Sequence, residues 1–209
     1  MERGLPCYMS KRFIKFTLLL CMLAAGVFLP EQESTGVPAV PPPLQGAPAF
    51  PNRSGALRDT SPELATLLRV VDGDTITIRF RGSTATVRFI GIDTPEKREN
   101  DKAHRDAART GQDIKTIIAA GKAAGDYLRS LIQPGAEVSL EFDVRRRDKY
   151  GRLLAYVYRK DGVMLNEALV LGGFASAYTL PPDVRYASRF RQAEAQARRE
   201  KRGLWRLGS

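Results

Sequence analysis

Four short polar pieces interrupt the apolar stretches of this 209-residue chain and carry side chains that could do chemistry. They are Asp72–Thr75 (DGDT), Arg88 inside the apolar run VRFIGI, Asp93–Glu96 (DTPE) and Asp148–Arg152 (DKYGR). Carboxylates can hold a hard cation or accept a proton, and an arginine presents a planar fork of donors to phosphate oxygens. An arginine in an apolar strand that leads into two carboxylates indicates a site for an anion beside a cation.

Each piece also has an ordinary structural interpretation when it is considered alone. DGDT and DKYGR are both typical of polar hairpin turns. Arg88 could be the partner of a structural carboxylate, and DTPE could begin a helix with a capping threonine and a first-turn glutamate. The order of the pieces and the elements that position them therefore decide between the interpretations.

Hydrophobic periodicity predicts those elements. Apolar and polar side chains alternate over residues 75–80, which is typical of a half-buried strand, and a preceding strand joins it around Asp72–Asp74. The other predicted elements are a third strand over 82–92, a helix over 114–132, strands over 136–144 and 152–159, a short helix over 163–173 and a helix over 183–202. Five strands with a helix between the third and the fourth predict an α+β fold, mainly β: a closed five-stranded OB-type barrel with three helices.

Two regions of the predicted domain, residues 62–209, are assigned to packing or to solvent. Residues 97–112 are polar, and we expect their basic side chains to form a solvated charged face, with guidance of a substrate as the alternative. The members of this face are Lys97, Arg98, Lys102, Arg105 and Arg109. The segment after Glu96 could also form a longer or more helical lid, and His104 is expected to be a solvated loop residue. In the last helix, Phe190, Ala193 and Ala197 form an inward stripe, and Trp205 is expected to close the core.

The first thirty residues differ in kind from the rest. A basic start precedes an apolar run from Phe16 to Leu29, which is shorter than a spanning helix usually needs and typical of a signal-peptide core. Residues 1–30 are therefore predicted to be a signal peptide, with a membrane anchor formed by residues 13–29 as the alternative. Both cysteines, Cys7 and Cys21, lie in this segment, so the remaining chain needs no disulfide framework.

Composition separates a linker from the domain and indicates an anionic partner. Residues 30–61 contain seven of the thirteen prolines, and residues 31–61 are predicted to be a proline-rich linker. The chain has a net charge of +10, and residues 31–209 keep 29 basic against 22 acidic side chains. This excess favours nucleic acid or an anionic lipid surface as the partner.

The four pieces, in this order and on these strands, resemble the thermonuclease (staphylococcal nuclease-like) family. The resemblance continues through GRLLAYVYRKDGVMLNEALVLGGFASAY and FRQAEAQARREKRGLW and covers roughly residues 64–206. It implies a five-stranded OB barrel with three helices, which agrees with the elements predicted above. It also implies a Ca²⁺-dependent phosphodiesterase that cuts DNA and RNA, preferably single-stranded or frayed, as an endonuclease leaving 3′-phosphate ends.

Residue by residue, the resemblance assigns catalytic, metal-binding and substrate-binding roles. Arg88 and Arg152 are expected to contact the scissile phosphate, and Glu96 is expected to be the general base. The metal is expected at Asp74, Asp93 and the carbonyl of Thr94. The expected nucleotide contacts are Lys149, Tyr150 and Tyr178. Where the staphylococcal pattern has a second tyrosine two residues after Tyr178, this chain has Leu180.

The chemistry of these residues agrees with the implied metal. An oxygen-only site with irregular geometry suits Ca²⁺ better than the stricter octahedron of Mg²⁺. Zinc is not indicated, because the chain has one histidine and residues 31–209 have no cysteine.

Two functional hypotheses from different classes follow from the sequence. The first is a secreted or periplasmic nuclease, or a membrane-anchored one facing outward, that acts as a monomer without an obligate protein partner. The second is a non-catalytic OB-type module that binds single strands or a protein. The presence of all five of Asp74, Arg88, Asp93, Glu96 and Arg152 favours the enzyme.

Overall fold

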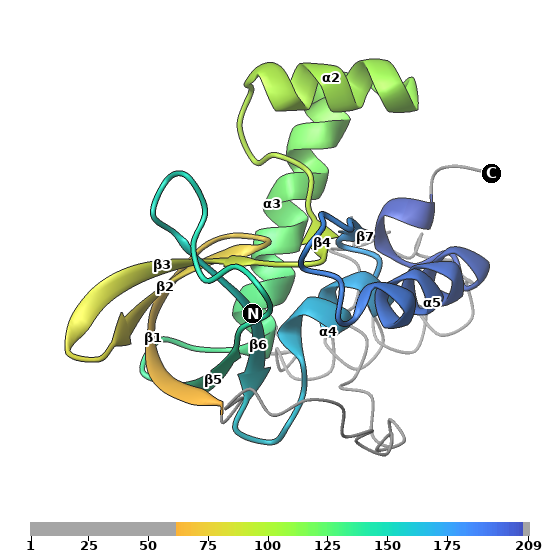
Figure 1. The fold of residues 1–209 in the computed structure, drawn as a ribbon. Helices are drawn as coiled ribbons and strands as arrows, with labels where there is room; N and C mark the ends of the chain where they lie inside the picture. Colours follow the sequence, from red (N-terminus) through yellow and green to blue (C-terminus); the bar gives the residue numbers. More distant parts are fainter. Residues whose placement is uncertain (1–61, 207–209) are drawn as a thin grey trace, which may run out of the picture. The chain divides into compact units, whose positions relative to one another are not determined.

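The barrel predicted from the strand pattern is present. The computed structural model describes residues 62–206, so the predicted signal or anchor segment (1–30) and the proline-rich linker (31–61) lie outside the described residues. Five strands close in the order β1-β2-β3-β6-β5, with β3 and β6 parallel and the other pairs antiparallel (Figure 1). They are β1 (Glu63–Asp72), β2 (Thr75–Phe80), β3 (Ser83–Phe89), β5 (Glu137–Glu141) and β6 (Leu153–Arg159).

Strand β2 is more deeply buried than its alternating pattern predicts. Thr75 and Thr77 are buried as well as the isoleucines between and beyond them, and Arg79 is the exposed position. The strand lies between β1 and β3 in the barrel. The hydroxyl of Thr75 donates to the carboxylate of Asp74 at 3.1 Å, so burial of this threonine serves the turn that carries Asp74.

Four α-helices accompany the barrel within residues 62–206, one more than predicted. They are α2 (Asp101–Thr110), α3 (Ile114–Leu131), α4 (Leu165–Leu171) and α5 (Ala187–Arg199), followed by the 3₁₀ helix η1 (Gly203–Arg206). The additional helix α2 occupies the stretch expected to be polar and charged, for which a more helical lid is the alternative expectation, and it crosses one end of α3 in Figure 1. His104, expected in a loop, is an exposed residue of α2 instead.

Caps explain why the polar residues of α2 form a helix. The side chain of Asn100 accepts a hydrogen bond from the backbone N–H of Ala103 at 2.9 Å. Gly111 ends the helix in the left-handed conformation, with φ 70°, where a glycine has no steric penalty. The two caps therefore define where this polar helix begins and ends, although Ala103 is its single buried residue.

A short two-stranded sheet, absent from the prediction, lies beside the barrel. It pairs β4 (Ile92–Asp93) with β7 (Ser176–Ala177), and Asp93 is opposite Ser176. Each strand has two residues, which is too short to give a periodic pattern. The pairing fixes the backbone of Asp93 and brings the segment that ends in Tyr178 alongside it.

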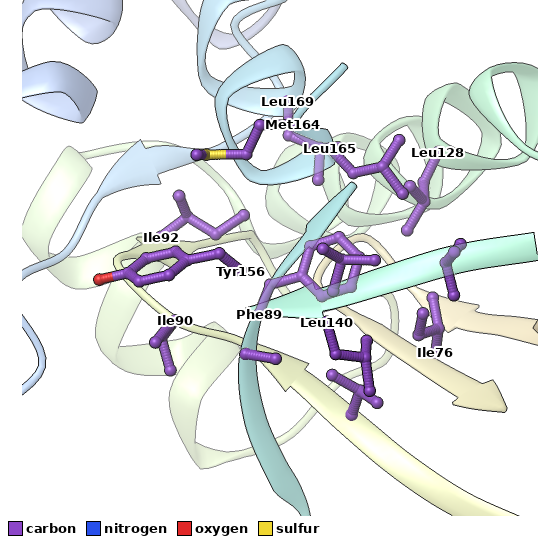
Figure 2. Packing of buried hydrophobic residues seen from close by; sticks show 14 of the residues in the cluster. Ile76, Phe89, Ile90, Ile92, Leu128, Leu140, Tyr156, Met164, Leu165 and Leu169 are labelled. Atoms are coloured by element: carbon purple, nitrogen blue, oxygen red, sulfur yellow. The ribbon is translucent and has the colours of Figure 1, made fainter. Parts of the chain in front are cut away.

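The core is continuous from the barrel interior to the helices. In Figure 2, Ile76, Phe89 and Leu140 from the strands cluster with Leu128 of α3 and Leu165 of α4. Each is nearly fully buried, and burial of such a side chain contributes about 1.5–3 kcal/mol. The barrel is therefore a rigid base for the loops and strand ends at its rim.

The last helix is shorter than predicted and packs as expected. Phe190, Ala193 and Ala197 of α5 are buried, which confirms the inward stripe. Trp205 does not belong to the buried core: it is half-buried in η1, and the Arg198 guanidinium lies 3.8 Å from its ring centroid. Within residues 62–206, no helix has both the length and the apolar character needed to cross a bilayer.

Candidate active site

Strand register brings the predicted catalytic and metal-binding residues to one end of the barrel. Thr75 of β2 is opposite Arg88 of β3, so the β1–β2 turn with Asp74 lies beside Arg88. The backbone N–H of Phe89 donates to the carbonyl of Asp74 at 2.8 Å and fixes this arrangement. Asp93 is the last residue of β4 and follows Arg88 by five positions.

Arg88 joins two carboxylates, Asp74 and Asp93, that are nineteen positions apart in the sequence and close in space. Its Nη1 lies 3.1 Å from Oδ2 of Asp74, and its Nη2 lies 3.1 Å from Oδ1 of Asp93. Nη1 also donates to the carbonyl of Phe89 at 2.8 Å. The Arg88 side chain is 17% exposed, so one face of the guanidinium region still reaches the surface.

Thr94 completes what we call the inner cluster: Asp74, Arg88, Asp93 and Thr94. Its backbone N–H and its hydroxyl both donate to Oδ2 of Asp74, at 3.0 and 2.7 Å. Asp74 and Thr94 are both buried. Because each buried polar atom named here has a partner, the cluster is internally satisfied.

Lys102 of α2 extends the inner cluster, although the sequence placed it on a solvated face. Its Nζ lies 3.1 Å from Oδ2 of Asp93, 2.9 Å from the carbonyl oxygen of Thr94 and 3.0 Å from Oδ2 of Asp106. Oε1 of Glu96 is 3.7 Å away. The Lys102 side chain is 28% exposed.

The expectation of a solvated face holds for part of the segment and is wrong for the rest. Arg98, Arg105 and Arg109 are exposed. Lys97 instead donates to the carbonyl of Val71, and Lys102 reaches into the site. The i,i+4 spacing of Lys102 and Asp106 is a signal for pairing on a helix, but the contacts to the DTPE loop are tertiary and leave no local pattern.

The charges of this group shift one another's pKa. The pKa of Asp93 lies above its ordinary value, because burial penalises the carboxylate more than Lys102 and Arg88 favour it. Burial acts to lower the pKa of the Lys102 ammonium, but the carboxylates of Asp93 and Asp106 outweigh it and raise that pKa. Lys102 is therefore a cation at neutral pH.

Glu96 is held by both neighbouring helices. Its Oε2 accepts a hydrogen bond from the side-chain amide of Asn100 at 2.9 Å. Its backbone packs on Gly121 of α3 so closely that a Cβ at position 121 would lie 2.4 Å from the Glu96 carbonyl. Gly73 approaches α3 in a similar way, since a Cβ there would lie 2.7 Å from that of Ala124. Small residues of α3 thus seat both loops of the site.

A groove of about 230 Å³ joins Arg88 to the second predicted arginine, Arg152. Arg145, Leu180 and the predicted base-contacting residue Tyr178 also line it. The side chain of Asp183, which is buried, accepts from the backbone N–H and from Nε of Arg145 at 2.9 and 2.8 Å. These bonds connect the loop before Arg152 with the loop after Tyr178. Arg145 and Asp183 are 38 positions apart, so no local pattern predicts this connection.

Arg152 is oriented by its own hairpin. Its Nε donates to Oδ2 of Asp148 at 2.7 Å, while Oδ1 of Asp148 accepts from the backbone N–H groups of Tyr150 and Arg152 at 2.9 and 3.0 Å. Burial acts to raise the pKa of Asp148, but these hydrogen bonds and the Arg152 charge outweigh it and hold the pKa below its ordinary value. DKYGR therefore forms a hairpin turn and also fixes the orientation of Arg152.

Two of the predicted nucleotide contacts lie on the other side of this hairpin. Lys149 is exposed, and its Nζ is 5.1 Å from the ring centroid of Tyr150, which is 72% exposed. Tyr150 and Arg152 border a second groove of about 480 Å³, which Arg81, Arg146 and Arg147 also line. We call Lys149, Tyr150, Arg152 and Tyr178 the outer cluster. Arg152 and Tyr178 share a groove with Arg88, whereas Lys149 and Tyr150 do not line that groove.

The donor set of the inner cluster has the chemistry of a hard-cation site. Within the described range 62–206, no three His, Cys, Asp or Glu side chains are arranged so that they could hold a metal ion. The Lys102 ammonium nevertheless sits among a carboxylate oxygen of Asp93, the carbonyl of Thr94 and Glu96. These are oxygens of the kind that Ca²⁺ and Mg²⁺ bind, and they converge on one positive charge. Asp74, the third predicted ligand, is engaged by Arg88 and Thr94 instead.

A family model described as staphylococcal nuclease homologue matches residues 86–207. The chain belongs to the staphylococcal nuclease family. This confirms the resemblance found in the sequence and agrees with the five-stranded barrel. The matched range includes Arg88, Asp93, Glu96 and Arg152, and it begins after Asp74.

Curated relatives support the same assignment. The chain is 33% identical over 155 residues to the thermonuclease of Staphylococcus hyicus, covering 74% of this chain and 83% of that protein. It is 39% identical over 142 residues to the SPbeta prophage-derived endonuclease YokF of Bacillus subtilis (strain 168), and 37% identical over 142 residues to endonuclease YncB of the same strain. These matches cover 67% of this chain in both cases, and 43% and 60% of the respective relatives, so the chain spans about half the length of the two Bacillus proteins.

Proposed function

We propose that this chain is an exported nuclease that hydrolyses phosphodiester bonds of DNA and RNA with Ca²⁺ and with little sequence preference. The observation that carries the proposal is the position of Arg88: its guanidinium contacts the carboxylates of Asp74 and Asp93 and lines one groove with Arg152. Names of family relatives, thermonuclease and endonuclease, support the same activity.

The two arginines suit a phosphodiester that lies in this groove. A guanidinium can donate two parallel hydrogen bonds to phosphate oxygens, and negative charge grows on those oxygens as water attacks. Arg152 stays oriented by Asp148 through Nε, which leaves its Nη groups for the substrate. Removal of one such donor typically raises the barrier by about 3 kcal/mol, or about a hundredfold in rate.

Glu96 is the residue best placed to take a proton from the attacking water. It is half-exposed, and Asn100 orients its carboxylate by a hydrogen bond to Oε2. Its Oε1 faces the cation position now held by Lys102. A proton acceptor must lie within hydrogen-bond reach of the water that it activates, and a site beside this position meets that need.

The residues that would hold Ca²⁺ are Asp74, Asp93 and the carbonyl of Thr94. A bound calcium ion supplies positive charge for the phosphoryl oxygens and orients the nucleophile. Oxygen-only donors from two loops and a backbone carbonyl favour the adaptable coordination of Ca²⁺ over that of Mg²⁺.

Exposed aromatic side chains in the outer cluster explain a low sequence preference. Tyr178 is 52% exposed at the groove, and Tyr150 is exposed on the hairpin. Every base has a π-face, so stacking on tyrosine contributes about 1–3 kcal/mol per base and discriminates little. Single-stranded or frayed substrate is preferred in this proposal because stacking requires an unpaired base.

Export, endonucleolytic cleavage and 3′-phosphate ends complete the proposal. Residues 1–30 support export to the periplasm or the medium, with an outward-facing membrane anchor at residues 13–29 as the alternative. The mode of cleavage rests on family membership. The proposed enzyme acts as a monomer.

One observation favours a second candidate, a non-catalytic module that binds single-stranded nucleic acid. Lys102 neutralises the carbonyl and carboxylate oxygens that a metal needs. If Lys102 keeps these oxygens from a metal, the protein could bind single-stranded nucleic acid in its grooves without hydrolysing it.

An assay on the full chain, purified in mild detergent because of residues 13–29, decides between the two. Heat-denatured DNA, RNA and closed circular DNA are incubated with millimolar Ca²⁺, with Mg²⁺ alone or with chelator. Glu96→Ser and Arg152→Ala are the site variants, and Arg105→Ala is the matched control, since Arg105 is exposed on α2. Ca²⁺-dependent cutting of all three substrates, lost in the site variants only, supports the nuclease. Binding without cutting in any metal rejects it in favour of the module.

A further inference from the structure

We infer that Lys102 is a built-in cation that occupies the metal position of this site, so that a metal ion binds only when Lys102 leaves. The inference rests on the proposed function only in taking Asp93 and Thr94 as metal-binding residues. It gives helix α2 a role in setting the affinity for the metal. This helix lies outside the four motif pieces on which the family resemblance rests.

The surroundings of the Lys102 ammonium are those of a bound cation. Three oxygens lie within 3.1 Å of Nζ, from Asp93, Thr94 and Asp106. An ammonium has three hydrogens to donate, so these contacts satisfy it completely. The oxygen of Glu96 at 3.7 Å adds a fourth negative group. The partners come from three places: β4, the loop after it and α2. Contacts from three elements hold the ammonium at a defined position, unlike a single surface ion pair.

The contacts also exclude a second cation. Asp93 uses Oδ1 for Arg88 and Oδ2 for Lys102, so both of its oxygens are engaged. The carbonyl of Thr94 is engaged by Lys102 as well. A divalent ion at these oxygens would lie within a few ångströms of the ammonium, where like charges repel strongly in a partly buried site. Lys102 and the metal are therefore mutually exclusive at Asp93.

Helix α2 provides an alternative partner for the Lys102 ammonium. Asp106 lies one turn further along α2 and already accepts from Nζ at 3.0 Å. Rotation of the flexible lysine stem can therefore break the contacts with Asp93 and Thr94 and keep the pair with Asp106. Ala103 is the single buried residue of α2, all of which is described, so a small shift of the helix also costs little.

Calorimetric titration of the full chain with CaCl₂ tests the inference directly. Lys102→Met is expected to lower the Kd for Ca²⁺ by about tenfold or more, which corresponds to about 1.4 kcal/mol. Lys102→Arg keeps the charge and is expected to bind Ca²⁺ as weakly as the wild type. Lys122→Met removes an exposed lysine of α3 and controls for the change in net charge. Equal Kd values for the wild type and Lys102→Met, or no Ca²⁺ binding by either, would overturn the inference.

A second measurement on the wild-type chain does not depend on the variant folding. Hydrogen exchange of the α2 amides is compared in chelator and at saturating Ca²⁺. We expect exchange in α2 to become faster with Ca²⁺, because the ion breaks the contacts that hold α2 to the DTPE loop. Unchanged or slower exchange in α2 with Ca²⁺ bound overturns the inference.

The outcomes separate this inference from the proposed function. Tighter Ca²⁺ binding by Lys102→Met without cleavage of any substrate supports the role of Lys102 and rejects the nuclease. Ca²⁺-dependent cleavage with Kd values that do not respond to Lys102 supports the nuclease and rejects the role of Lys102.

Discussion

The inner and outer clusters handle charge in opposite ways. In the inner cluster, each side chain is fixed by strand register or a buried loop, and its polar atoms are paired with other members of the site. In the outer cluster, the side chains project from loops and are exposed or half-exposed, and among residues 62–206 the hydrogen bonds and ion pair of the Arg152 side chain stay within its own hairpin. Both clusters hold an arginine that we propose to contact phosphate. Arg88 is held by residues from several elements of the fold, whereas Arg152 is held by its own hairpin.

This difference predicts how each cluster couples activity to stability. A buried ion pair adds little net stability, but loss of one partner leaves an uncompensated charge and costs several kcal/mol. An exposed ion pair contributes little to folding stability, so the loss of one partner also costs little. Substitutions of the inner cluster should therefore change folding and catalysis together, whereas those of the outer cluster should change substrate binding alone.

Arg88→Met is the strongest test of the difference between the two clusters. It leaves Asp74 and Asp93 without their shared guanidinium, so we expect the free energy of unfolding to fall by about 2–4 kcal/mol. Urea unfolding followed by the fluorescence of the single tryptophan, Trp205, measures the change. Arg152→Met is the matched variant and should change the free energy of unfolding by about 0.5 kcal/mol or less. Equal losses for the two variants would contradict the distinction between the clusters.

Gly121→Ala is expected to have the next largest effect, because it acts on the backbone beneath Glu96. The added Cβ would lie 2.4 Å from the carbonyl of Glu96 and must push the loop off α3. We expect a loss of about 1–3 kcal/mol in the free energy of unfolding, typical of overpacking, together with a lower kcat.

Gly125→Ala, one turn further along α3, provides the control for Gly121→Ala. The nearest atoms to a Cβ at position 125 lie 3.6 Å away in the Arg129 guanidinium, an ordinary contact. Because alanine is the better helix former, this change should stabilise the protein by about 0.5–1 kcal/mol. A stabilising Gly121→Ala, measured by the same unfolding assay, would mean that the close approach to Glu96 is not needed.

Tyr178→Ala tests whether a residue of the outer cluster affects substrate binding without affecting stability. Loss of one stacking surface is expected to raise KM about 5- to 150-fold, from about 1–3 kcal/mol of stacking. The free energy of unfolding should stay constant, because the side chain is 52% exposed. Tyr178→Phe keeps the ring and should keep KM close to that of the wild type. Steady-state cleavage of single-stranded DNA gives both constants, and a fall in kcat without a change in KM would assign Tyr178 to the inner cluster instead.

The predictable parts of the molecule are those with a local pattern. The barrel strands and α3 follow from hydrophobic periodicity, and the stripe of α5 from the 3.6-residue repeat. Helix α2 has alanines as its only apolar side chains, and β4 and β7 are two residues each, so hydrophobic periodicity does not identify these three elements.

The candidate site divides in the same way. Asp74, Arg88 and Asp93 stand in short motifs, and their proximity follows from strand register. Lys102 resembles any other lysine of a charged stretch until α2 is folded against the DTPE loop, since its partners other than Asp106 come from other elements. The sequence therefore predicts the residues that stand in the motifs and misses Lys102, whose position depends on tertiary contacts.

The smallest expected effect is on the pH dependence of stability, where Asp93 of the inner cluster and Asp148, the partner of Arg152 in the outer cluster, should differ in sign. The pKa of Asp148 is lowered in the folded state, so its contribution to stability is present above the unfolded value of about 3.9 and is lost as pH falls through the folded value. The pKa of Asp93 is raised, chiefly by burial, so the folded state binds more protons over the window between the unfolded and the folded value. Acidification through that window should therefore favour folding through Asp93 and oppose it, at lower pH, through Asp148. Unfolding of the wild type, Asp93→Asn and Asp148→Asn in chelator between pH 3 and pH 7 measures both slopes. Parallel curves for the two variants would show that Asp93 and Asp148 respond alike to pH, and the contrast between the clusters would then be confined to geometry.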